Sequence, residues 1–193
     1  MLTMKITGNG IPRLEKAIEA LGEVKARNAY RRAVNEAGRD TRTPVKNALA
    51  KQTGLKSGVA HRALKVTKAS NAKLEYTLTG QGGDIALKHF AARETRKGVS
   101  AAPWGQRKVF PHTFIKGGLF PGRKKLDMGQ HAFMPNQHLT KWGRKFTKAK
   151  SGVIIPNEMV QGATAEVFEK TGSTKLEQKV HEHIRKVTSG VLS

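Results

Sequence analysis

Carboxylates and histidines are the side chains that could do chemistry in this chain, and they are scattered. Between residues 82 and 150 the acidic side chains are Asp84, Glu94 and Asp127. A metal-dependent nuclease needs several carboxylates around Mg²⁺, so this supply is thin. The sequence has no cysteine, which excludes thiolate metal sites and a cysteine nucleophile. We therefore expect a protein that is not an enzyme and that uses no cofactor.

His181 and His183 form the closest pair of histidines in the sequence. Positions two apart on a helix point to different faces, so such a pair does not converge on one metal ion. We interpret residues 181–183 as part of an exposed helix and predict no metal site there.

Positive charge is the strongest chemical feature of the chain. Lys and Arg number 36 against 14 Asp and Glu, a formal net charge of +22, and residues 51–150 carry +17 of it. Charge of this density repels itself unless a partner neutralises it. Nucleic acid, an acidic protein surface or an anionic membrane could each do so, and a basic surface that only aids solubility is the remaining interpretation.

The residue types give little support to a membrane partner or to sequence-specific binding of nucleic acid. No amphipathic basic helix with an aromatic face is present, and no apolar stretch is long enough to span a bilayer, so we expect no membrane contact. Zinc-finger spacing, basic-leucine-zipper heptads and base-stacking aromatic runs are also missing, which argues against sequence-specific nucleic-acid recognition. We name the candidate contact residues the basic belt: Arg93, Arg96, Lys97, Arg107, Lys108, Arg123, Lys124, Lys125, Arg144 and Lys145.

The order of the expected helices and strands predicts one α+β domain over residues 1–193, and this domain must carry the basic belt. Residues 1–22 read as a lead with a short helix. Residues 23–63 read as helical, with an alanine-rich apolar stripe, a kink or division at Pro44 and a stop at Gly54. Residues 156–193 read as C-terminal helices, over 157–169 and 173–188.

Residues 64–155 read as a small, mostly antiparallel sheet with a long basic loop at 116–152. Alternating residues predict a hairpin with a turn at 81–84, whose buried face is Leu74, Tyr76, Leu78, Ile85 and Leu87. Residues 99–110 predict one or two further strands, interrupted by Pro103 and Gly105. The long loop shows no period and is predicted to be disordered until a partner binds.

Several motifs occur in an order that resembles a known family. They are Ile85-Ala-Leu-Lys-His-Phe90, then Arg93 and Thr95-Arg-Lys-Gly98-Val99, then Trp104-Gly105, Phe110-Pro-His-Thr-Phe-Ile115 and Ile155-Pro156. Asn35, Arg39 and Thr41 before Pro44 add to the pattern. Together they resemble the minor tail protein Z family, the tail completion proteins of lambda-like, long non-contractile-tailed bacteriophages. The likeness covers roughly residues 20–170.

This resemblance implies a structural virion protein that completes the head-proximal end of the tail and enables head–tail joining. Its expected partners are other tail proteins (the tail terminator, the tail tube and the head–tail connector), copies of itself in a ring, with hexamer as the implied order, and the packaged DNA end. Its expected location is the virion, with assembly in the host cytoplasm. The ring would form by strand addition and by packing of the alanine-rich helix on a neighbour. The alternative is a nonspecific nucleic-acid-binding protein that uses its basic central region.

Overall fold

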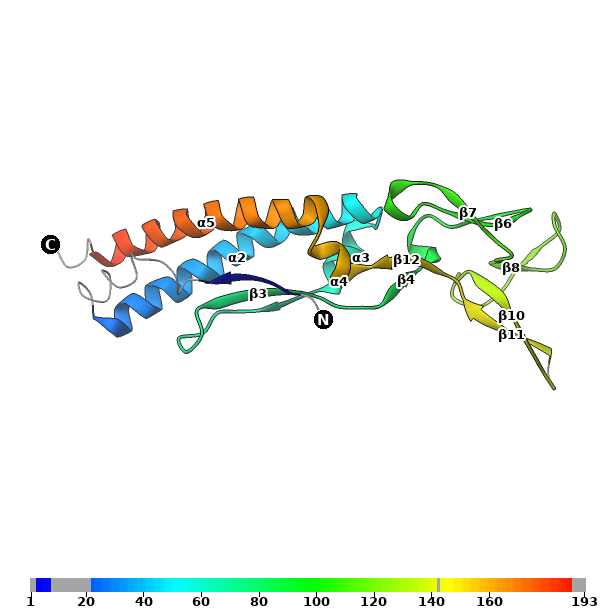
Figure 1. The fold of residues 1–193 in the computed structure, drawn as a ribbon, viewed down its shortest axis with the longest axis horizontal. Coiled ribbons are helices and arrows are strands. Elements are labelled where there is room, and N and C mark those ends of the chain that lie inside the picture. The colour runs from blue at the N-terminus through cyan, green and yellow to red at the C-terminus, as the bar shows by residue number, and fades with distance from the viewer. Residues whose placement is uncertain (1–2, 8–21, 142, 189–193) are drawn as a thin grey trace.

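The chain forms an elongated molecule with a helical half and a distal half made of small sheets (Figure 1). The computed structural model describes residues 3–7, 22–141 and 143–188. The short helix predicted within residues 1–22 lies outside the described residues. The α+β class, with a long N-terminal helix, small antiparallel sheets and C-terminal helices, is confirmed.

The helical half is built on α2 (Glu23–Thr53), which ends at Gly54 as predicted. Gly54 has φ 75°, a left-handed conformation that glycine adopts at no steric cost. Pro44 lies inside α2 and does not divide it. Thr41 and Val45, on either side of the proline, are fully buried, so packing holds the helix together where one backbone hydrogen bond is lost.

Helix α5 (Gly162–Thr188) lies along α2, and this pairing forms the bulk of the helical half (Figure 1). The alanine-rich stripe of α2 is buried in this half, including Ala26, Ala33 and Ala37. The sequence predicted a break between residues 169 and 173, but α5 is continuous, and a short helix, α4 (Ile155–Met159), precedes it. Gly172 lies within α5 at the expected break, facing Ile6 of β1, and a Cβ atom there would meet Ile6 at an ordinary 3.6 Å.

A three-stranded antiparallel sheet covers one side of α2. Its order is β1 (Thr3–Thr7), β3 (Glu75–Gly80) and β2 (Leu64–Thr67), and α3 (Ser57–Ala63) leads into β2. Ile6 pairs with Tyr76, and Val66 pairs with Leu78. Tyr76 and Leu78 are buried as the alternation predicted. Strand β1 was missed because its apolar alternation, Met4 and Ile6, is too short to stand out.

The predicted hairpin between residues 74 and 87 is wrong. Strand β4 (Asp84–Ala86) pairs with β12 (Lys150–Ile154) instead of with β3. The Asp84 carboxylate accepts a 2.8 Å hydrogen bond from the Gly152 N–H, and the Ser151 hydroxyl donates to the Ile85 carbonyl at 2.7 Å. These bonds select a partner far along the chain. Leu87 begins a short 3₁₀ helix, Leu87–His89; it and Leu74 are buried, whereas Ile85 is half-buried.

The distal half contains three further small sheets. In the first, β5 (Arg93–Thr95), β6 (Gly98–Ala101) and β7 (Lys108–Pro111) are antiparallel, and a 3₁₀ turn, Pro103–Gly105, separates β6 from β7 as expected. The others pair β8 (Lys116–Gly117) with β9 (Lys124–Lys125), and β10 (Phe133–Thr140) with β11 (Gly143–Lys148).

The predicted long basic loop at 116–152 is therefore largely replaced by strands β8 to β12. Aromatic side chains explain the order. Phe114 and Phe133 exchange two backbone hydrogen bonds at 2.8 Å, and the Phe114 ring meets Phe146 edge to face, with 5.1 Å between ring centroids. This cluster gives the basic segment an apolar anchor that its lack of a regular period conceals.

One apolar cluster joins the two halves, because it holds Val34 and Leu49 of α2 together with Leu87 of the 3₁₀ helix and Val99 and Val153 of the strands. Gln52 adds polar bonds at the same junction. Its amide donates to Glu158 Oε2 at 2.9 Å and accepts from the Thr164 N–H and hydroxyl at 2.9 and 2.8 Å. Among the described helices, none is both long and apolar enough to cross a membrane.

Candidate partner-contacting surface

The basic belt lies in the distal half, and its first members are on β5 and in the β5–β6 turn. Arg93 is exposed on β5, and Arg96 and Lys97 are exposed in the turn. The Thr95 hydroxyl closes the turn with a 2.6 Å hydrogen bond to the Gly98 carbonyl. Gly98 has φ 144°, and a Cβ atom at this position would lie 2.1 Å from the Phe110 carbonyl oxygen. The turn therefore requires glycine, and it holds Arg96 and Lys97 outward.

Arg107 is exposed, but its guanidinium is held by hydrogen bonds within the distal half. Its guanidinium donates to the Ser100 carbonyl and hydroxyl at 3.3 and 3.2 Å and to the Ala91 carbonyl at 3.3 Å. These bonds tie the start of β7 to β6 and to the chain that precedes β5. The next residue, Lys108, stays exposed, with its ammonium 5.1 Å from the Phe110 ring centroid and 5.6 Å from that of Trp104.

Arg123 is also engaged within the chain. It forms an ion pair with Glu94, and its side chain is only 20 % exposed. Glu94 accepts backbone hydrogen bonds from Ile115 at 2.7 Å and Lys116 at 3.0 Å as well. One carboxylate thus links β5, the start of β8 and the segment before β9. The sequence predicted Arg123 to be a solvated charge on a loop. In the structure its ion pair stabilises the distal fold instead.

The remaining belt residues differ in how they are placed. Lys124 and Lys125 lie exposed on β9, and Lys145 lies exposed on β11. Arg144 also belongs to β11, but its side chain lies outside the described residues. The exposed belt cations without an ion pair in the described part of the chain are Arg93, Arg96, Lys97, Arg107, Lys108, Lys124, Lys125 and Lys145, and Arg107 alone among them donates to backbone carbonyls of neighbouring segments.

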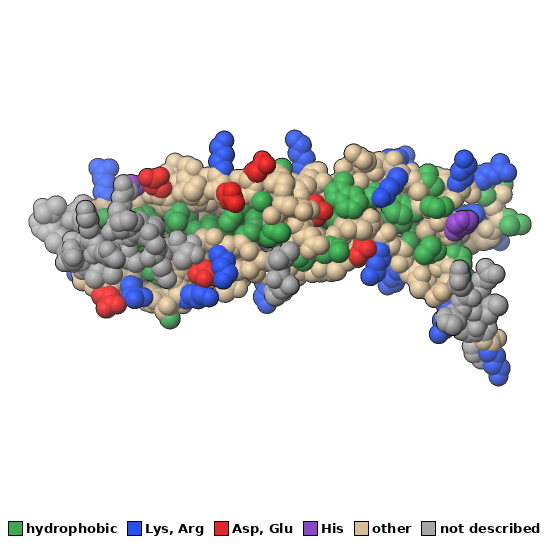
Figure 2. All heavy atoms as spheres, in the orientation of Figure 1, with side chains coloured by type: hydrophobic (Ala, Val, Ile, Leu, Met, Phe, Trp, Pro, Cys, Tyr) green, Lys and Arg blue, Asp and Glu red, His purple; other side chains and the backbone are tan. Residues whose placement is uncertain are grey.

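Large apolar side chains are exposed among these cations, which sequence reasoning did not detect. Leu119 is 89 % exposed, and Phe120 and Phe146 are each about half exposed. Figure 2 shows lysine and arginine side chains projecting beside apolar ones at the distal end. Scattered apolar exposure is ordinary, but several large side chains between cations mark a surface suited to a protein partner.

Two histidines of the distal half, His89 and His131, have lowered pKa values. Burial and the nearby Lys88 lower the pKa of His131, and burial with Lys88 and Arg62 lowers the pKa of His89. Lys88 Nζ lies 2.8 Å from His131 Nε2, so a neutral imidazole can accept its proton in a hydrogen bond. Within residues 3–7, 22–141 and 143–188, no three His, Asp or Glu side chains converge on a possible metal position.

The expectation of a plain exposed helix at residues 181–183 is wrong for one residue. His181 is exposed, but His183 is buried against α2, with Nε2 3.1 Å from Glu36 Oε1. Lys179 lies 3.4 Å from the other oxygen of Glu36. This polar contact between α5 and α2 explains a buried histidine without a ligand.

The chain matches no family model, no curated protein and no solved structure in the three comparisons made.

Proposed function

We propose that the protein is a structural component of a long-tailed phage virion, which completes the head-proximal end of the tail and prepares it to join the head. The ordered motifs between Asn35 and Pro156 support this, as does an α+β chain whose scattered carboxylates suit no hydrolytic centre. The observation that carries the proposal is the distal surface, where free cations surround exposed apolar side chains. Acidic tail proteins are the partners that such a surface fits.

We propose that six copies form a ring through contacts between the exposed edges of their sheets. The alanine stripe of α2 is buried within the chain, so it offers no face for a neighbouring copy. Strands β5 and β7 are the outer strands of their sheet, and β1 and β2 are the outer strands of theirs. An outer strand presents backbone donors and acceptors to a further strand. Strand addition is therefore the ring contact that we retain.

The test reverses exposed belt charges and spares Arg123, whose ion pair supports the fold. The double variant Lys124→Glu with Lys125→Glu is added to tails assembled without this chain, and joining to filled heads is counted by electron microscopy. We expect joined particles to fall at least about tenfold, because like charges then face the acidic partner. Joining at the wild-type level would remove β9 from the contact.

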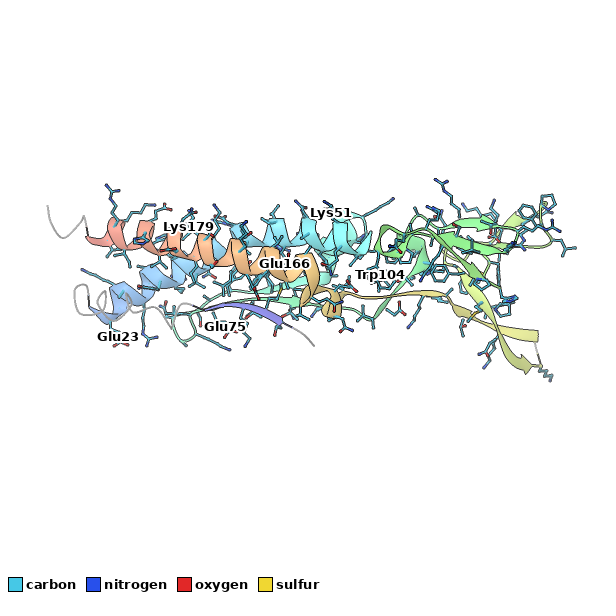
Figure 3. All side chains as sticks on the ribbon, turned by 45° about the horizontal axis from the view of Figure 1, so that its top comes forward. Glu23, Lys51, Glu75, Trp104, Glu166 and Lys179 are labelled. Atoms are coloured by element: carbon cyan, nitrogen blue, oxygen red, sulfur yellow. The ribbon has the colours of Figure 1, made fainter. Side chains whose placement is uncertain are left out.

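A matched control carries the same change in net charge in the helical half. Lys51 and Lys170 are both exposed, and Figure 3 shows Lys51 on α2, in the helical half. Lys51→Glu with Lys170→Glu should leave joining within about twofold of wild type. Equal loss in both double variants would mean that net charge alone matters, and the belt would have no specific role.

The alternative of a nucleic-acid-binding protein that works through the basic belt makes a different prediction. Binding to phosphates falls steeply with salt, by about 0.9 in log affinity per log unit of salt for each phosphate neutralised on duplex DNA. Exposed Leu119 and Phe120 contribute nothing to such binding. Replacing both with Ser should therefore weaken binding to tail proteins and leave DNA affinity unchanged if the tail proposal holds.

A further inference from the structure

A second cationic surface lies in the helical half, between α2 and the strand pair β2–β3. It is a groove of about 590 Å³, and its cations are Arg31, Arg32, Arg39, Arg42 and Lys68. We call it the cationic groove. None of its residues belongs to the basic belt.

The frame of the cationic groove is held rigidly. The Asn35 amide donates to the Ala69 carbonyl at 3.0 Å and accepts from the Ala69 N–H at 2.8 Å, which fastens α2 to the end of β2. The Tyr76 ring packs on Gly38, where a Cβ atom would lie 2.2 Å from the ring. Burial raises the pKa of Tyr76, although Arg42 and Arg39 act against this, so the phenol stays neutral. The arginines therefore project from a fixed surface.

Within residues 3–7, 22–141 and 143–188, no carboxylate forms an ion pair with a cation of the groove. Glu36 is the carboxylate in the groove lining, and α5 already holds it through Lys179 and His183. The Nε atoms of Arg31 and Arg42 are buried and lack a hydrogen-bond partner among the described residues. Both side chains are nevertheless partly exposed, so the outer nitrogens of each guanidinium remain open to an anion in the groove.

We propose that the cationic groove binds the sugar–phosphate backbone of a nucleic acid. Four of its five cations are arginines, whose planar forks match phosphate oxygens. Arg31 and Arg42 are eleven positions apart on α2, which corresponds to about 17 Å along the helix axis. Cations spread over this length suit a repeating polyanion better than a single anion.

The composition of the groove favours nucleic acid over an acidic protein. Its apolar members are Tyr76, which is 3 % exposed, and Val66, which is half-buried, so no aromatic anchor is offered to a protein. Interfaces with nucleic acid are more polar and more positive than those between proteins. The Asn35 amide is already bonded to Ala69, so it cannot read a base edge. Contacts of the arginines to phosphate oxygens carry no sequence information, so we expect binding of random-sequence duplex.

The test measures binding of the full chain to a labelled random-sequence duplex of about 20 base pairs across a salt series. In the groove variant, Arg32→Gln with Arg39→Gln, both changed residues are exposed, so the fold is retained. We expect affinity to fall about tenfold and the log–log salt slope to shrink by about 1.8, the value for two lost phosphate contacts. The second variant, Arg31→Gln with Arg42→Gln, should show the same loss, with circular dichroism confirming the helices.

The control removes two charges from the basic belt, as Lys124→Gln with Lys125→Gln. A smaller loss of affinity in this control supports the groove, and an equal loss would show general attraction to a polycation and overturn the proposal. Polyglutamate that displaces the duplex at matched charge would assign the groove to an acidic protein instead. The assay contains no tail components, so its outcome is independent of the tail proposal.

Discussion

Trp104 and Glu158 are joined by a 3.1 Å hydrogen bond from the indole Nε1 to the carboxylate Oε1. Figure 3 shows Trp104 where the helical half meets the distal strands. Trp104 belongs to the turn between β6 and β7, and Glu158 belongs to α4. The bond therefore couples the surface that carries Lys108 to the base of α5, alongside the bonds that Gln52 makes to the same carboxylate.

Replacing Trp104 with Phe should lower the free energy of unfolding by about 1–3 kcal/mol. The change leaves Glu158 Oε1 with the Gln161 amide at 3.4 Å as its remaining partner. Urea unfolding followed by circular dichroism measures the loss. In a Glu158→Gln background the same replacement should cost less, with a coupling of at least about 0.5 kcal/mol. Equal costs in both backgrounds would show that the bond contributes nothing.

Gly38→Ala should destabilise the protein although alanine is the better helix former. Its Cβ atom would lie 2.2 Å from Cγ of Tyr76, which the buried ring cannot avoid without shifting β3 away from α2. We expect a loss of about 1–3 kcal/mol. Gly172→Ala is the matched control, because its Cβ atom would meet Ile6 at an ordinary 3.6 Å. That variant should gain up to about 1 kcal/mol. A stabilised Gly38→Ala protein would contradict the packing described.

Acid should weaken the contact between α2 and α5. Burial acts to raise the pKa of Glu36, but His183 and Lys179 outweigh it and hold the pKa below its ordinary value of 4.5. Between the lowered pKa and 4.5 the unfolded chain binds more protons than the folded one, so stability rises with pH. The contribution of Glu36 is present above about pH 4.5 and is lost as pH falls through the folded-state pKa.

The measurement compares wild type with Glu36→Gln by urea unfolding from pH 7 down to pH 3. The wild-type advantage should be below about 1 kcal/mol at pH 7, because the carboxylate is partly exposed, and should shrink as pH falls below about 4.5. Glu182, whose pKa Lys186 and Lys179 hold at about 2, titrates in both proteins and cancels. A difference that stays constant with pH would exclude the proposed role of the Glu36 charge.

Reversing Arg123 should have a different effect from reversing its neighbour Lys124. Arg123→Glu places two carboxylates face to face at Glu94 and should lower stability by about 3 kcal/mol or more. Lys124→Glu changes an exposed residue and should stay within about 0.5 kcal/mol. Hydrogen exchange at Ile115 and Lys116, whose amides donate to Glu94, reports the loss locally. Unchanged exchange in Arg123→Glu would mean that this ion pair does not hold the segment.

Leu87→Ala should cost about 2–5 kcal/mol, because Leu87 is fully buried in the apolar cluster that joins the two halves. Leu119→Ala removes the same atoms from a side chain that is 89 % exposed and should cost less than about 0.5 kcal/mol. Thermal unfolding of both variants checks the pair. Similar melting temperatures would place Leu87 outside the core.

Local patterns in the sequence predicted α2, its stop at Gly54 and the buried alternation of Tyr76 and Leu78. They could not predict the partner of β4. Alternating hydrophobicity shows which side chains share one face of a strand, but not which strand pairs with it. That choice depends on Ser151 and Gly152, far along the chain. The helical pattern predicted two segments, 157–169 and 173–188, but one helix, α5, runs through Gly172.

The same limit applies to the candidate surfaces. Residue type alone predicted a basic surface but could not separate Arg107 and Arg123, which bond inside the fold, from Lys124 and Lys125, which do not. The contacts that decide this come from Ser100, Ala91 and Glu94. The cationic groove was missed because Lys68 joins the arginines of α2 only after β2 folds against the helix.

The pairing of α2 with α5 also has a consequence for synthesis on the ribosome. Helix α2 and the strands of its sheet are complete once residue 80 has emerged, but the helix that covers Ala26 and Ala33 begins at residue 162. Throughout the intervening elongation the alanine stripe of α2 has no cover from α5. A nascent chain that stalls before α5 therefore keeps this apolar face bare, and proteases and chaperones can distinguish it from a finished molecule.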